Sequence, residues 1–313
     1  MLLLRTGVSR GKKVAKPLVS VIIPVYNDEK RIIDCVNSVY EQSQKNYSLE
    51  VIVVDNGSSD NTLAIIESEL KTKYKDLILE RCEVPGSYAA RNQGLSVCNG
   101  DFTAFTDSDC IVSKNWIDAN LTKIKGEGVT TIIAGEVNFF KENEKFTEQS
   151  AIDFENTFSM KQEENAKNGK CITANFFCYK KFFDSVGVFN SKLKSGGDVE
   201  ISQRAVTKGG AVIFNPEASV NHPSRNVHEL IVKRKRIIGG NWETKLKRST
   251  TVERVAFLVK LLKMFLGRGK SVLFNSNLTL SRKAGLIYLL FKIWITSNVE
   301  FFRLFLGKEA NRS

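Results

Sequence analysis

The sequence predicts an α/β protein in which a mostly parallel central sheet is covered by helices on both faces. Short runs of apolar and β-branched residues alternate with segments whose apolar residues recur at helical spacing. The strand-like runs are apolar throughout, as expected for strands that are buried on both faces. Such an alternation of strands and helices is typical of a parallel sheet.

Strands are expected where a short apolar run is bounded by turn residues. In chain order, the expected strands are residues 18–24, 51–54, 77–84, 101–107 and 130–140, one within 170–180, and residues 211–222. Helices are expected where apolar residues repeat every three or four positions. They are residues 28–42, 61–70, 87–98 and 146–165, one ending near residue 190, and one beginning near residue 198.

After His222 the sequence changes to basic, aromatic-rich segments with helical periodicity, of which residues 252–267 and 285–307 are the longest. One face of the second segment carries a polar stripe at helical spacing, made of Lys292, Thr296, Glu300 and Arg303. A spanning helix needs about 20 apolar residues with few charges. Three arrangements stay open: a helix in the membrane interface, which the polar stripe favours, a helix docked on the domain, and a membrane span.

The net charge of +12 resides in the C-terminal third of the chain. Residues 223–313 contain 19 lysines and arginines against five acids, a net charge of +14, whereas residues 1–222 have a net charge of −2. This asymmetry is typical of a segment that meets an anionic surface, whether lipid, nucleic acid or phosphate.

The cysteines and the N-terminus indicate a cytoplasmic protein. The six cysteines are scattered without a CxxC pair, which argues against a zinc site and against a disulfide scaffold. We expect them to be reduced and mostly buried. Residues 1–16 lack the apolar core and cleavage site of a signal peptide and are expected to form a loose basic arm.

Carboxylates follow two of the predicted strands. Asp55 ends the second strand, and Asp107 and Asp109 end the fourth with only Ser108 between them. Because ligands of parallel sheets bind at the carboxyl ends of the strands, these residues should open into one crevice. Aspartates also suit turns and helix caps. A Mg²⁺ or Mn²⁺ ion would remove the repulsion between the carboxylates and would bind substrate phosphates.

Five segments occur in a fixed order along the chain: VSVIIPVYND, VIVVDNGSSDNT, GSYAARNQG, AFTDSDC and GGDVEIS. Together they resemble the family 2 glycosyltransferases, enzymes of the GT-A fold that use a nucleotide-activated sugar. The resemblance covers about residues 18–225. It implies a transferase domain over 17–225 between the arm, 1–16, and a basic amphipathic helical region, 226–313.

The resemblance also implies roles for residues around the donor. Asp55 matches the carboxylate that hydrogen-bonds the nucleotide base, and the residues that frame this base are Pro24, Tyr26 and Asn27. Arg91 matches a contact on the nucleotide side, and a guanidinium suits phosphate geometry. Asp107 matches the ribose or metal aspartate, and Asp109 matches the metal ligand that bridges to the diphosphate. Alternatively, Tyr26 packs in the interior, and Arg91 or Asn92 pairs or caps locally.

The segment KSGGDVEISQR matches a motif that contains the general base of inverting enzymes. Asp198 falls on this base, which takes the proton of the acceptor hydroxyl while that hydroxyl attacks the anomeric carbon. Gly197 stands where the family usually has glutamate. Asp198 could instead cap the following helix. Glu200 is expected to be an acid of the first helical turn rather than a substitute carboxylate.

Two further groups of residues follow from the resemblance. His222 lies where some family members place a metal-ligating histidine, although a lone histidine is more often structural, and His228 is expected on the surface. Arg234 and Arg236 lie in a basic segment that resembles a lid over the diphosphate, and a solvated or lipid-facing helix is an equal alternative. Cys110 follows where many relatives have another acid, so the metal is expected to be held weakly before the nucleotide binds.

The sequence therefore predicts a metal-dependent inverting glycosyltransferase. Its partners would be a nucleotide-diphospho-sugar donor, a lipid-linked or polysaccharide acceptor, and the cytoplasmic face of a membrane; no nucleic acid is expected. The QxxRW signature of processive synthases is absent, which argues for transfer of a single sugar.

Two other classes remain as alternatives. A sugar-phosphate nucleotidyltransferase should carry a glycine-rich loop after the first strand, and IPVYNDEKR lacks one. A catalytically impaired relative, or a basic module that binds membrane or nucleic acid, is kept open by Gly197.

Overall fold

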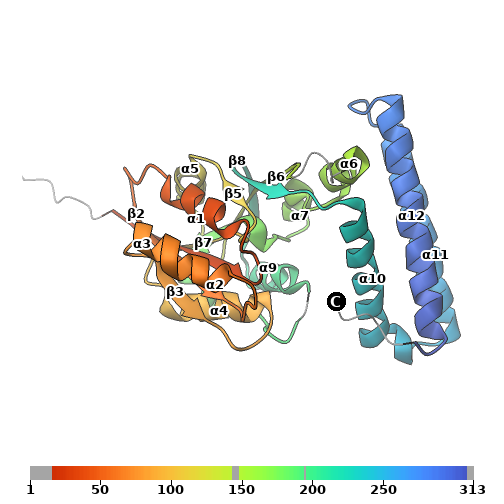
Figure 1. Cartoon of the computed structure of the whole chain (residues 1–313), viewed down its shortest axis with the longest axis horizontal. Coiled ribbons are helices and arrows are strands. Elements are labelled where there is room, and N and C mark those ends of the chain that lie inside the picture. The colour runs from red at the N-terminus through yellow and green to blue at the C-terminus, as the bar shows by residue number, and fades with distance from the viewer. Residues whose placement is uncertain (1–15, 143–147, 194, 309–313) are drawn as a thin grey trace, which may run out of the picture. The chain divides into compact units, whose positions relative to one another are not determined.

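The computed structural model describes residues 16–142, 148–193 and 195–308 (Figure 1). Nearly all of the predicted N-terminal arm lies outside these residues. The chain forms two compact units: a sheet unit of Met1–Glu136 and Gln162–Val220, and a helical unit of Val137–Lys161 and Asn221–Ser313. The division falls inside two strands that continue unbroken across it. The predicted boundary at residue 225 stays a prediction.

The sheet has eight strands in the order β3-β2-β1-β4-β7-β6-β8-β5. Their bounds are β1 Leu18–Val25, β2 Ser48–Asp55, β3 Ile78–Arg81, β4 Phe102–Phe105, β5 Ile111–Val112, β6 Ile132–Phe140, β7 Phe176–Tyr179 and β8 Val212–Pro223. The pairs β3–β2, β2–β1 and β1–β4 are parallel, and β7 pairs antiparallel with both β4 and β6. The α/β prediction is confirmed, with a parallel half that holds β1, β2 and β4.

The helices of the sheet unit are α1 Ile32–Tyr40, α2 Thr62–Ile65, α3 Lys71–Lys73, α4 Ser87–Val97, α5 Trp116–Ile124, α7 Gln162–Lys167, α8 Phe182–Val186 and α9 Gly197–Thr207, with a π-helical stretch Ile66–Leu70 between α2 and α3. Helix α4 packs on β1 and β2. A Cβ atom at Gly94 would lie 2.5 Å from Ile22 Cγ2, so glycine allows α4 to approach the sheet closely. This packing fixes the position of the α4 side chains at the strand ends.

The single helix predicted over residues 146–165 is wrong, because the structure has two helices there. Helix α6 (Gln149–Phe158) belongs to the helical unit, and α7 begins at Gln162 in the sheet unit. Between them Met160 has φ +44°, a left-handed conformation that interrupts the helix. The Gln162 side chain donates to the carbonyls of Ile172 and Asn175 and so ties α7 to the sheet unit.

Asn175 joins three elements in the interior of the sheet unit. Its side chain is fully buried and accepts a hydrogen bond from Trp116 Nε1 at 2.8 Å. Its amide donates to the carbonyls of Glu136 and Ala218, at 2.9 and 2.8 Å. Asn175 thus connects β6, β8 and α5 through buried and partly buried hydrogen bonds.

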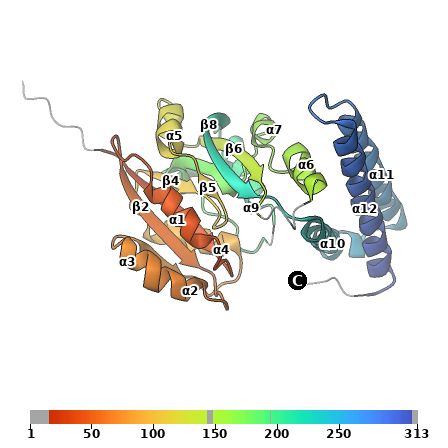
Figure 2. The ribbon, with the colours of Figure 1, turned by 45° about the horizontal axis from the view of Figure 1, so that its top comes forward.

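The helical unit consists of α6, α10 Val227–Thr244, α11 Thr251–Leu273 and α12 Leu280–Phe305, with a short 3-10 turn Leu246–Arg248. Capping boxes begin α10 at Asn226 and α11 at Thr250. Helix α12 contacts α10, α11 and α6, and α11 runs beside it in both views (Figure 2). The Asp153 side chain of α6 is fully buried and is paired with Arg282 of α12.

The predicted polar stripe of α12 does not form the outer face of the helix. Glu300 is 3% exposed and accepts hydrogen bonds from Arg303. One position after the stripe residue Thr296, Ser297 is fully buried and accepts a hydrogen bond from Arg234 of α10. The polar groups of α12 therefore pack largely inward, and most of its exposed side is apolar. Among the described residues, α12 alone is long and apolar enough to cross a membrane, judged by length and composition only.

The role of Asn175 leads to a stability prediction. Asn175→Ala leaves the indole N–H and two carbonyls without their buried partner, which should lower the free energy of unfolding by about 3 kcal/mol. Urea denaturation measures this loss. Asn168→Ala, which removes an exposed asparagine of the same unit, should change stability little. Equal stability of the two variants would contradict the bridging role.

Candidate active site

The predicted site residues belong to the sheet unit, except His222, and most of those on the nucleotide side lie at or just after the carboxyl ends of β1, β2 and β4. The loop after β1 is tied to the loop after β2: the Asn27 N–H donates to Ser58 Oγ at 2.9 Å, and the Ser59 N–H donates to Asn27 Oδ1 at 2.7 Å. Asn27 has φ +50°. Pro24 is buried within β1 itself, and Tyr26 is 62% exposed and so does not pack in the interior.

Asp55 ends β2 and is only 4% exposed. Its carboxylate accepts hydrogen bonds from the backbone N–H groups of Gly57 and Ser58, at 3.2 and 3.3 Å. These bonds hold the carboxylate in one orientation at the base of the loop. A buried carboxylate that is held in one orientation suits a hydrogen bond from the N–H group of a planar ligand.

Asp28, which the sequence did not single out, joins this loop to the aspartate pair. Its Oδ2 accepts from Ser108 Oγ at 2.6 Å, and its Oδ1 accepts from Arg31 Nε at 2.5 Å. Ser108 therefore anchors the turn between Asp107 and Asp109. In a sequence, an acid just before a helix indicates a helix cap, so the hydrogen bond between Asp28 and Ser108 could not be predicted.

Arg91 of α4 pairs with Asp107, with Nη2 and Oδ1 2.5 Å apart. The alternative that Arg91 pairs locally is thereby supported. The arginine is 3% exposed, and its Nε is a buried donor without a partner among the described residues. A buried guanidinium with an unused donor fits a phosphate oxygen. Asn92 exchanges two hydrogen bonds with the backbone of Phe189 and is structural.

The negative charge of the site acts on two buried thiols. Burial raises the pKa of Cys35 well above its ordinary value, and Asp109, Asp28 and Asp107 raise it further. Burial and the same pair of aspartates, 107 and 109, raise the pKa of Cys110. Both thiols are therefore protonated at neutral pH. All six cysteines are free and buried, as expected.

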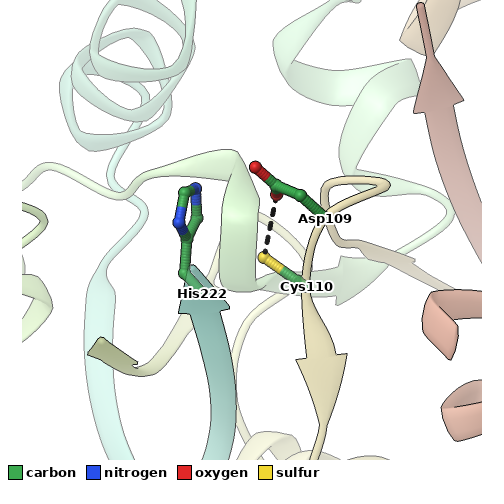
Figure 3. Close-up of side chains that lie close together, drawn as sticks. All are labelled: Asp109, Cys110 and His222. Carbon is green, nitrogen blue, oxygen red and sulfur yellow. Dashed lines mark hydrogen bonds between the residues drawn. The ribbon is translucent and has the colours of Figure 1, made fainter. Parts of the chain in front are cut away.

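Asp109, Cys110 and His222 bring their ligand atoms within 4.8 Å of one another (Figure 3). The Cys110 thiol donates to Asp109 Oδ1 at 3.6 Å. His222 is 3% exposed at the end of β8, and its Nδ1 lies 2.8 Å from the Pro223 carbonyl oxygen. If Nδ1 carries the proton, Nε2 is left as an acceptor. A carboxylate and an imidazole suit an Mn²⁺-like ion, whereas a protonated thiol binds a hard ion poorly.

Asp198 lies in the first turn of α9, whose N-cap is Gly196, so the alternative that Asp198 is the N-cap is wrong. Its Oδ1 accepts from the hydroxyl of Tyr88 at 3.2 Å. Glu200 forms an i, i+4 salt bridge with Arg204 and is an acid of the first helical turn, as expected. Its carboxylate binds Arg204 and does not act as a substitute for the missing glutamate.

The ring of Tyr88 explains why residue 197 is a glycine. A Cβ atom at Gly197 would lie 2.8 to 2.9 Å from three carbon atoms of this ring. Tyr88 is 7% exposed and stacks on Phe189, so it cannot move aside easily. The space of the usual glutamate side chain is therefore occupied by an aromatic ring that also holds Asp198. This contact could not be predicted from the sequence, because the two residues are 109 positions apart in the chain.

Helix α4 thus connects the two predicted groups of carboxylates. Tyr88 bonds to Asp198, and one turn later Arg91 binds Asp107. The Arg91 guanidinium lies 5.8 Å from the centre of the Tyr88 ring. A continuous chain of contacts therefore runs from α9 to the end of β4. By contrast, Arg234 is held by Ser297 in the helical unit, and His228 is exposed on α10 as expected.

Comparison with known proteins identifies the class of the chain. The family model described as Glycosyl transferase family 2 matches residues 20–187. Over 240 residues the chain is 36% identical to Glycosyltransferase AglE of Haloferax volcanii, covering 76% of this chain and 78% of that protein.

Two solved structures are similar in fold. Mannosyltransferase PcManGT from Pyrobaculum calidifontis, in complex with GDP-Man and Mn²⁺, gives a TM-score of 0.57 at 18% identity over 94% of this chain and 89% of that chain. S. aureus TarS 1-349, in complex with UDP-GlcNAc, gives 0.53 at 17% identity over 93% and 92%.

The fold and these similarities define a glycosyltransferase with the GT-A fold. The chain belongs to the family 2 glycosyltransferases.

The close contact between Tyr88 and Gly197 can be tested without an activity assay. Gly197→Ala should lower the free energy of unfolding by about 1–3 kcal/mol, because the new methyl group overpacks against the ring. In a Tyr88→Ala background the same substitution should cost much less. Urea denaturation of the two single variants and the double variant measures this coupling. Gly240→Ala is the control, because its added Cβ meets nothing within 4 Å in α10.

Proposed function

We propose that the protein is a metal-dependent inverting glycosyltransferase that moves a single sugar from a nucleoside-diphosphate donor to a lipid-linked or polysaccharide acceptor at the cytoplasmic face of a membrane. The observation that carries this proposal is the α4 bridge, in which Tyr88 holds Asp198 and Arg91 holds Asp107. It places Tyr88, which holds the candidate base on α9, and Arg91, a candidate phosphate-binding group, a turn apart on one helix.

The donor would lie along the carboxyl ends of β1, β2 and β4. Asp55 would accept the N–H of the nucleotide base, and the exposed ring of Tyr26 would cover that base beside Pro24 and Asn27. The unused Nε of Arg91 would donate to the diphosphate. Solved relatives of this fold with UDP-GlcNAc or GDP-Man support a nucleotide-sugar as the ligand class.

Asp109, with Asp107 and His222, would hold Mn²⁺ or Mg²⁺. When bound, such an ion would neutralise the charge that develops on the departing diphosphate. The complexes of similar structures with Mn²⁺ support a divalent ion. The protonated, buried Cys110 offers no charge, so this chain would hold the ion weakly until the donor oxygens complete its shell.

Asp198 would act as the general base. Its carboxylate would take the proton of the acceptor hydroxyl, the hydroxyl oxygen would form the new bond to the anomeric carbon, and the nucleoside diphosphate would leave from the opposite face. Tyr88 would orient the carboxylate through its hydroxyl. The Tyr88 hydroxyl would thus support Asp198 in place of the missing glutamate, which favours an active enzyme over a catalytically impaired relative.

The roles of Asp109 and Asp198 predict two distinct defects. Asp198→Asn should lower kcat by about 10²- to 10⁴-fold with little change in donor affinity, because only proton removal is lost. Asp109→Asn should instead weaken Mn²⁺ binding, measured by titration of the ion in the presence of a nucleoside diphosphate. Release of nucleoside diphosphate from a panel of nucleotide-sugars measures kcat. Glu200→Gln, two positions from Asp198 in the first turn of α9, is the matched control and should stay active. Full activity in Asp198→Asn would remove the proposed base.

The hydroxyl of Tyr88 should affect the reaction through Asp198. Tyr88→Phe keeps the ring but removes the hydroxyl that holds the Asp198 carboxylate in one orientation, so kcat should fall by about ten- to a hundredfold with little change in donor affinity. A loss confined to kcat, at a urea midpoint equal to that of the wild type, distinguishes this positioning role from simple loss of folded protein. An unchanged kcat, or an equal loss of donor affinity, would argue against it.

A further inference from the structure

The outer faces of α11 and α12 are unusually apolar. Large hydrophobic side chains recur there at intervals of one helical turn, or of two turns between Leu266 and Leu273, and each is at least 41% exposed. They are Val252, Val255, Val259, Leu262, Leu266 and Leu273 on α11, and Tyr288, Phe291, Ile295, Val299, Phe302 and Phe305 on α12. We call these two rows the outer apolar stripes. Contiguous exposed apolar surface of this kind marks an interaction site.

The outer apolar stripes are not core-facing surfaces whose packing partners are missing. Helix α12 already buries a separate row against its neighbours, including Leu286, Leu290 and Ile293. Its polar Ser297 and Glu300 are buried in the same direction. A helix on a water-exposed surface normally carries its polar residues outward. Here apolar side chains form the outward row, which fits an apolar environment on that side.

The charges beside the stripes select among possible partners. Residues 251–308 contain ten lysines and arginines and only two acids. Of these acids, Glu300 is buried against Arg303, and Glu253 forms the capping box of α11. The exposed lysines include Lys260, Lys263 and Lys270 beside the α11 stripe and Lys292 beside the α12 stripe. A second copy of this face would bring like charges together, whereas anionic lipid headgroups would complement them.

The α12 stripe also contains a groove of about 550 Å³. Its lining includes Ile295, Val299, Phe302 and Leu306, with Arg303 and Lys308 toward the C-terminal end of the helix. Trp294 lines the groove as well, and its indole N–H is buried without a partner among the described residues. An apolar channel with cationic groups at one end fits a lipid chain and its phosphate.

We propose that the outer apolar stripes of α11 and α12 form a docking surface for an anionic lipid bilayer, with both helices lying in the membrane interface. The apolar rows would enter the boundary between headgroups and acyl chains, and the bordering lysines would reach the phosphates. Helix α12 would not span the membrane, because its inner face is held by α6, α10 and α11, including the Asp153–Arg282 pair. The inference rests on the proposed function in one respect only: the docking surface would keep the enzyme beside a lipid-linked acceptor.

Flotation of the full chain with lipid vesicles tests this surface without any donor or acceptor. The wild-type protein should float with vesicles of phosphatidylcholine and phosphatidylglycerol and float less with phosphatidylcholine alone. Leu262→Glu with Val299→Glu should weaken partitioning at least about tenfold, because each change removes apolar contact and adds a negative charge. Failure of this test leaves the Asp109 and Asp198 assays unaffected, so the two proposals can fail separately.

A matched control is available on the sheet unit. Val129→Glu with Val188→Glu changes two valines that are 40% and 50% exposed, with the same change of charge, and should float as the wild type does. Lys263→Gln with Lys292→Gln should reduce the preference for phosphatidylglycerol and the sensitivity to salt. Urea midpoints equal to that of the wild type would show that each variant is folded.

Trp294 provides a second readout of contact with acyl chains. Trp116 is fully buried and Trp242 is 7% exposed, so quenching by lipids with brominated chains should act mainly on Trp294 and disappear in Trp294→Phe.

Several results would overturn the proposal. One is a wild-type protein that stays soluble with both vesicle types, and another is an equal loss of flotation in the control variant. A dimer in sedimentation that Leu262→Glu with Val299→Glu dissolves, without vesicle binding, would identify a second copy as the partner. Resistance of the bound protein to alkaline carbonate would indicate a spanning helix.

Discussion

Repulsion between carboxylates at the ends of β1 and β4 is the constraint around which the sheet unit is arranged. Asp28, Asp107 and Asp109 act together on the buried Cys35 thiol, so they share one region of negative potential. Arg31 and Arg91 offset part of it through short contacts. The turn at Ser108 is anchored on Asp28, and the Arg91 side chain of α4 pairs with Asp107, so both arrangements satisfy these acids. The remaining negative charge makes a cation a favourable ligand.

Much of this arrangement could be predicted because it depends on local sequence. Parallel strands have unbroken apolar runs, and their carboxyl ends meet at one edge, so Asp55, Asp107 and Asp109 could be grouped without coordinates. Tyr88 and Asp28 could not, because their partners come from distant segments, and the family motifs that contain them assigned neither residue a role. The break at Met160 was missed for a related reason: the apolar periodicity continues through it, and the side chain of Gln162 decides the path of the chain.

The helical unit shows the same limit on a larger scale. Helical spacing predicted α11 and α12 as amphipathic segments, but not which side of α12 would be buried. That choice depends on the partners: Arg234 of α10 and Arg303 supply hydrogen bonds to Ser297 and Glu300, so polar groups can face inward. Once these groups are satisfied inside, the apolar row is left for the outside. Periodicity predicts that a helix has a polar and an apolar face, and tertiary contacts decide which face is buried.

The contact between Tyr88 and Gly197 changes how family motifs should be compared. A motif score treats Gly197 as the loss of an acid, and thus as damage. The geometry indicates an exchange of volume, in which a ring from α4 fills the space given up on α9 and provides the hydrogen bond to Asp198. The ring at position 88 and the missing side chain at position 197 therefore depend on each other sterically. Members of the family with an aromatic residue at the first position should carry glycine at the second, and moving either residue alone into a relative should damage it.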